Sequence, residues 1–67
     1  MSQKERVLIY LKTNGSITAL DAMKDLGIID LAGRVRDLRQ SGVDVKSKPE
    51  MVKNRYGEPC RIVRYTL

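Results

Sequence analysis

The sequence predicts a single α+β domain over residues 1–67, with three helices, one short strand and a C-terminal β-hairpin. Two observations lead to this fold class. Capping residues and glycines divide residues 1–42 into three short segments whose apolar residues recur at helical spacing. Residues 43–67 instead hold two β-branched, basic segments on either side of a turn motif, Asn54 to Gly57.

The three helices follow from their boundary residues. We expect them over residues 3–14, 19–26 and 31–41, with Ser2, Thr18 and Asp30 as N-caps and Gly15, Gly27 and Gly42 as the residues that end them. The apolar spacing predicts that the second helix buries one face, formed by Ala19, Leu20, Met23 and Leu26. The β-branched stretch around Ile17 predicts a brief strand between the first two helices.

Residues 43–67 are expected to form the hairpin. The turn suits a type I geometry with Gly57 in the left-handed region, so Asn54 faces Glu58 and the pairing runs outward to Val45 opposite Leu67. Pro49 lacks an N–H group, so its strand should be an edge or be broken there. Two short helices joined by a glycine turn and followed by such a ribbon make a winged helix-turn-helix, in which the hairpin is the wing.

The positive charge lies in the second half of the chain. The formal net charge is +5; residues 1–30 hold four basic and four acidic side chains, whereas residues 31–67 hold nine basic and four acidic ones. A one-sided positive field favours a polyanionic partner.

The third helix has the pattern of a recognition helix. At 100° per residue, Leu31, Val35 and Leu38 form a narrow buried stripe. The residues opposite the stripe are the expected readers of base edges in a DNA major groove: Gly33, Arg36, Asp37 and Gln40. Arg34 and Arg39 lie on the flanks and are expected to contact phosphates. A solvated outer face in which Asp37 pairs with Arg34 is the structural alternative.

The wing supplies a second set of expected phosphate contacts, namely Lys46, Lys48, Lys53, Arg55 and Arg64. The register places Lys48 directly opposite Arg64, where like charges are destabilising and a bound phosphate would relieve them. Lysines on an exposed strand can instead serve only to prevent aggregation.

One apolar strip, formed by Val52, Cys60 and Ile62, falls on the face of the wing that the register turns outward. Either the register is shifted by one residue, which would exchange the two faces, or the strip is an interface. In the second case it would serve a homodimer or another protein partner.

Composition excludes several classes of protein. With no histidine and a single cysteine, the chain offers neither a zinc site nor a disulfide. We expect no cofactor and no enzymatic activity, because no nucleophile with an adjacent base, carboxylate pair or glycine-rich phosphate loop is present. No apolar run is long enough to span a bilayer and the N-terminus lacks a signal-peptide core, which predicts a cytoplasmic protein without membrane contact.

Three segments carry a resemblance to a known family. Residues 17–28 (ITALDAMKDLGI), residues 31–39 (LAGRVRDLR) and a hairpin that ends in Tyr65 and Leu67 resemble the small winged helix-turn-helix domains of bacteriophages and prophages. The resemblance implies a DNA-binding regulator in a bacterial host cell. It also implies that Arg34, Asp37 and Arg39, which recur in the family pattern, are partly structural.

The expected function is therefore sequence-specific binding of double-stranded DNA, with helix 31–41 in the major groove and hairpin 43–67 as the wing. One alternative is an excisionase-like architectural factor that bends DNA. The other is a phage module that binds and inhibits a host protein, which the apolar strip favours.

Overall fold

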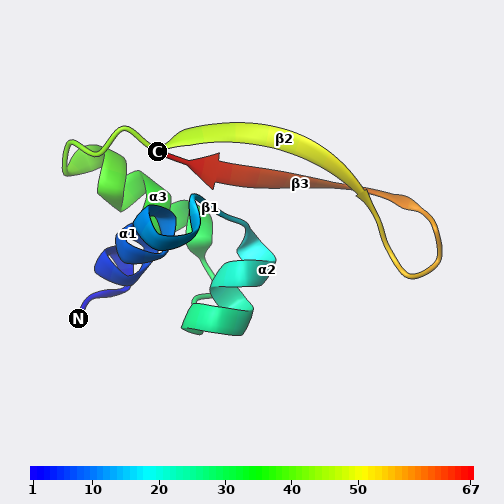
Figure 1. Cartoon of the computed structure of the whole chain (residues 1–67), viewed down its shortest axis with the longest axis horizontal. Coiled ribbons are helices and arrows are strands. Elements are labelled where there is room, and N and C mark those ends of the chain that lie inside the picture. The colour runs from blue at the N-terminus through cyan, green and yellow to red at the C-terminus, as the bar shows by residue number, and fades with distance from the viewer.

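The computed structural model describes all residues from Met1 to Leu67 and contains the expected elements in the expected order (Figure 1). The helices are α1 (Gln3–Asn14), α2 (Ala19–Asp21), its π-helical continuation η1 (Ala22–Leu26) and α3 (Leu31–Gln40). The strands are β1 (Ser16–Ile17), β2 (Lys46–Lys53) and β3 (Pro59–Thr66). The helices gather at one end, and the hairpin of β2 and β3, the wing, extends beyond them (Figure 1).

The antiparallel sheet has the order β1-β3-β2, and its register is the one that the turn motif predicts. Lys48 lies opposite Arg64, and the Asn54 N–H donates to the Glu58 carbonyl at 3.0 Å. Gly57 has a φ of 75°, which closes the loop in the left-handed region. β2 runs unbroken through Pro49. The strand tolerates this proline because it lies at an edge of the sheet.

The core is small and centres on α3. Nine apolar residues are buried: Val7, Leu11, Ile17, Ala22, Ile28, Leu31, Val35, Leu38 and Val45. The predicted stripe of α3 is thus confirmed: it packs against α1 and shares the core with Ile17 of β1, and Tyr65 of β3 is partly buried against that core. Away from this core, the Tyr10 hydroxyl donates to Asp25 at 2.8 Å and ties α1 to η1. This bond raises the pKa of the Tyr10 phenol, because the neutral phenol is the donor.

The predicted buried face of the second helix is wrong. Its capping box is present, with Thr18 and Asp21 bonded reciprocally, but Ala22 is the buried residue and only Leu26 of the predicted face packs against the core. Leu20 and Met23 are 69% and 55% exposed. The helix turns into the wider π form at Ala22, so the angular spacing of an α-helix does not apply across the segment.

The start of α3 depends on Asp30, whose Oδ1 accepts the Gly33 N–H at 3.0 Å. Replacing Asp30 with alanine leaves that N–H without its partner, so we expect a loss of about 1 kcal/mol in the free energy of unfolding, measured by urea denaturation. Asp30→Ser retains a capping oxygen and should keep most of the stability. An Asp30→Ala variant as stable as the wild type would contradict this cap.

Candidate nucleic-acid interface

The free face of α3 is formed by exposed residues on the side away from the core. Ala32, Arg36, Arg39 and Gln40 are exposed, whereas Leu31, Gly33, Val35 and Leu38 are buried. Arg36 and Gln40 make no side-chain hydrogen bond or ion pair within the chain, so their donors are available to a partner. These two residues have the exposure that a base-reading function requires.

Gly33 does not belong to this face, and the prediction that it points outward is wrong. A Cβ added at this position would lie 2.9 Å from Cγ of Asp30 and closer still to Oδ2. The glycine therefore leaves room for the capping carboxylate of Asp30. Its position is explained by the start of the helix, without any need for a close approach to DNA.

Arg34 and Asp37 are bound to each other and to α1. Arg34 Nε lies 3.0 Å from Asp37 Oδ2, and Arg34 Nη1 donates to Gln3 Oε1 at 3.1 Å. Both side chains are only partly exposed. The pairing named above as the structural alternative is thus present, and it fixes the α1 flank of the free face.

Arg39 also has an acceptor within the chain. Its Nε and Nη2 both donate to the Val45 carbonyl, at 3.0 Å and 2.8 Å. The side chain remains exposed on the flank of α3 that faces the wing. Of the three arginines in α3, only Arg36 is therefore without an intramolecular partner.

The wing tip is a closed loop that presents two cations. The Asn54 side-chain oxygen accepts the N–H groups of Tyr56 and Glu58, at 2.9 Å and 3.1 Å. Lys53 and Arg55 are exposed on either side of Asn54. The two predicted phosphate contacts at the tip thus extend from a loop whose backbone is held in place.

The other predicted phosphate contacts of the wing lie on its far face. Ile17 is buried and pairs with Tyr65, so odd-numbered residues of β3 face the helices. Because side chains alternate along a strand, Arg64 and the paired residues Lys46 and Lys48 point to the opposite face. The predicted register already put these three residues together on that face, and the pairing of the strands agrees with it.

Arg64 is neutralised by the chain itself. Its Nε donates to Glu50 Oε1 at 2.9 Å and its Nη1 to Ser16 Oγ at 3.1 Å. The hydrogen bond to Glu50 raises the pKa of the guanidinium. The like-charge pair of Lys48 and Arg64 is therefore relieved by a carboxylate of the same strand pair, and a bound phosphate is not needed.

Sequence reasoning missed Arg61. This residue is exposed and makes no hydrogen bond within the chain. Like Tyr65 it is an odd-numbered residue of β3, so it lies on the side of the wing that faces the helices. It lines a groove together with Ala32 of α3. The signal was in the predicted register, which put Val63 and Tyr65 on the inner face and so also Arg61.

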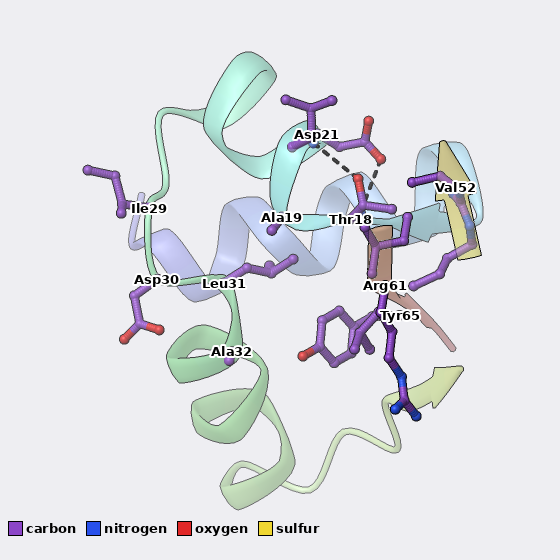
Figure 2. A pocket seen from close by; sticks show the side chains of 14 residues that line it. Thr18, Ala19, Asp21, Ile29, Asp30, Leu31, Ala32, Val52, Arg61 and Tyr65 are labelled. Atoms are coloured by element: carbon purple, nitrogen blue, oxygen red, sulfur yellow. Dashed lines mark hydrogen bonds between the residues drawn. The ribbon is translucent and has the colours of Figure 1, made fainter. Parts of the chain in front are cut away.

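The groove is an apolar hollow of about 730 Å³ beside β3. Its walls are the start of α2, the turn before α3 and residues 61–65 of β3, and Tyr65 lies between β3 and the start of α3 (Figure 2). Ile29 is 85% exposed at its rim, and three side chains from the other face of the wing, Val52, Ile62 and Arg64, also line it. Since the register is confirmed, the apolar strip does lie on one face of the wing, with Val52 exposed and Cys60 and Ile62 partly buried.

The family model described as a winged helix-turn-helix domain matches residues 2–67. The chain belongs to this family. No curated protein and no solved structure matches it. The match agrees with the three helices and the antiparallel sheet of this domain. Winged helix-turn-helix domains are in general DNA-binding modules. No helix is both long and apolar enough to cross a membrane.

The contacts of α3 predict that replacing Arg34 or Arg36 has different effects on the free energy of unfolding. Arg34→Ala should lower the free energy of unfolding by about 0.5–1 kcal/mol, because it removes an ion pair and a bond to α1. Arg36→Ala should change it by less than about 0.5 kcal/mol, because Arg36 contacts no acceptor. Urea denaturation of the two variants makes the comparison, and equal losses would show that Arg36 is structural.

Proposed function

We propose that this domain binds double-stranded DNA sequence-specifically and acts as a transcriptional regulator of a phage or prophage in a bacterial cell. The observation that supports this function best is the free face of α3, where Arg36 and Gln40 have no partner in the chain while the neighbouring Arg34 is tied down. An arginine can form a bidentate pair with guanine and a glutamine with adenine in the major groove.

In the proposed complex, α3 lies in the major groove and the wing contacts the backbone beside it. Arg36 and Gln40 read base edges, and Asp37, bonded to Arg34, contributes indirectly. Phosphates are bound by Lys53 and Arg55 at the tip and by Arg61 on the inner face of the wing. Lys46 and Lys48 are left out of this set because they lie on the face opposite Tyr65, and Arg64 because its guanidinium is bound to Glu50 and Ser16.

Duplex binding should weaken steeply as salt rises, because each neutralised phosphate releases counterions. We expect Arg61→Ala to reduce the magnitude of the slope of log K against log salt by about one, and Lys48→Ala to leave that slope unchanged. Fluorescence anisotropy with a labelled duplex over a salt series measures both. The two variants are matched, since each removes one exposed cation from the wing.

Two results would contradict the proposal. Absence of binding to any duplex at low salt would reject DNA as the partner. A slope that falls with Lys48→Ala and not with Arg61→Ala would retain DNA binding but reverse the face of the wing that contacts it.

Within DNA binding, an excisionase-like architectural factor is an alternative that uses the same surface. It differs by bending the duplex, so circular-permutation mobility of a bound fragment distinguishes it from a regulator that leaves DNA straight.

A second candidate function is protein binding. The partner would be a host protein or a second copy of this chain, bound through Val52, Cys60 and Ile62. The exposed apolar side chains around the groove, Leu20 and Ile29 above all, favour it. The double variant Leu20→Ser/Ile29→Ser should leave duplex affinity unchanged if DNA contacts only the basic face. A loss of duplex affinity in a folded variant would place Leu20 and Ile29, and not only Arg61 of this groove, within the DNA interface.

A further inference from the structure

The root of the wing is joined to α3 by one side chain. Arg39, in the last turn of α3, donates two hydrogen bonds to the carbonyl of Val45, and β2 begins at the next residue. Val45 itself is only 3% exposed and belongs to the core. The guanidinium therefore connects the end of the helix to the point from which the wing leaves the body.

The Val45 carbonyl has no partner in the sheet. The Asn54–Glu58 hydrogen bond sets the alternation of the ladder, so even-numbered residues of β2 bond to β3 and odd-numbered residues direct their N–H and C=O groups to the open edge. Pro49 fits this alternation. It is odd-numbered, so the position where other residues carry an N–H faces the open edge, and the N–H that proline lacks is not needed for the ladder. Val45 is odd-numbered, so its carbonyl points away from β3 and is satisfied by Arg39. Two donors from a charged group on one carbonyl form a strong and directional contact.

The direction of the wing is sensitive to this contact because the wing is long. The molecule measures 38 Å along its longest axis and about half that across. A strand of eight residues extends roughly 26 Å, so a rotation of about 10° at its root displaces the tip by roughly 4–5 Å. Displacements of this size decide whether cations at the tip reach a phosphate.

We propose that Arg39 is a positioning residue that fixes the angle between the wing and α3, so that both fit one duplex at once. This inference rests on the proposed DNA-binding function, and it replaces the expectation that Arg39 contacts phosphate. Arg39 acts through the Val45 carbonyl on the wing, whereas Arg36 contacts the partner directly.

The first test measures the wing in the absence of DNA. Spin labels on the native Cys60 in β3 and on a cysteine introduced at the exposed Lys12 of α1 report the distance distribution between wing and body by double electron–electron resonance. We expect a narrow distribution for the wild type and a broad or shifted one for Arg39→Ala, with Arg39→Lys between them. Circular dichroism confirms that each variant is folded. An unchanged distribution in folded Arg39→Ala overturns the proposal.

The second test measures duplex binding over a salt series. Arg39→Ala should weaken binding about tenfold at every salt concentration and leave the salt slope unchanged, because pre-organisation is lost and no phosphate contact is removed. A slope reduced by about one would show that Arg39 contacts phosphate, and this overturns the proposal. If the wild type binds no duplex while the spin-label distances still respond to Arg39, the DNA-binding function fails and the positioning contact stands.

Discussion

The narrow stripe by which α3 is anchored is the constraint on which the rest of the structure depends. Leu31, Val35 and Leu38 hold the helix against α1 and the sheet, and they occupy only one side of it. Burial of three aliphatic side chains contributes several kcal/mol, which is a large share of what a domain of this size can gain. The helix is held firmly along one line, and its opposite side is left free for a partner.

The flanks of α3 are fixed by arginines. Arg34 bonds to Asp37 and α1 on one side, and Arg39 bonds to the Val45 carbonyl on the other. Arg64 is likewise bound to Glu50 in the wing. In contrast, Arg36 and Arg61 have no acceptor in the chain. The positive half of the sequence therefore contains two populations of arginine, one that orients α3 and the wing and one that is available to phosphates or bases.

Local signals predicted the fold well. N-caps such as Asp30 and left-handed glycines such as Gly57 act over a few residues, so they mark helix ends and the hairpin register without tertiary information. The register alone already implied the inner position of Arg61. The face of α2 could not be predicted, because the helix changes to the π form at Ala22 and the residues that follow no longer keep the angular spacing of an α-helix.

The candidate site was predicted less completely, since it depends on contacts between distant segments. Nothing in the spacing of α3 shows that Asp30 fills the space beside Gly33 or that Arg39 reaches Val45. Strand alternation placed Lys48 opposite Arg64 correctly, but nothing in the sequence shows that Glu50 and Ser16 bind the Arg64 guanidinium.

Selection of bound sequences from a random duplex pool tests the central claim, that the free face of α3 reads DNA, most directly. The wild type should enrich one short motif, and Arg36→Ala should relax the preference at one or two positions of that motif while the rest is retained. A pool that stays random, or the same motif with equal stringency from both proteins, would contradict the claim.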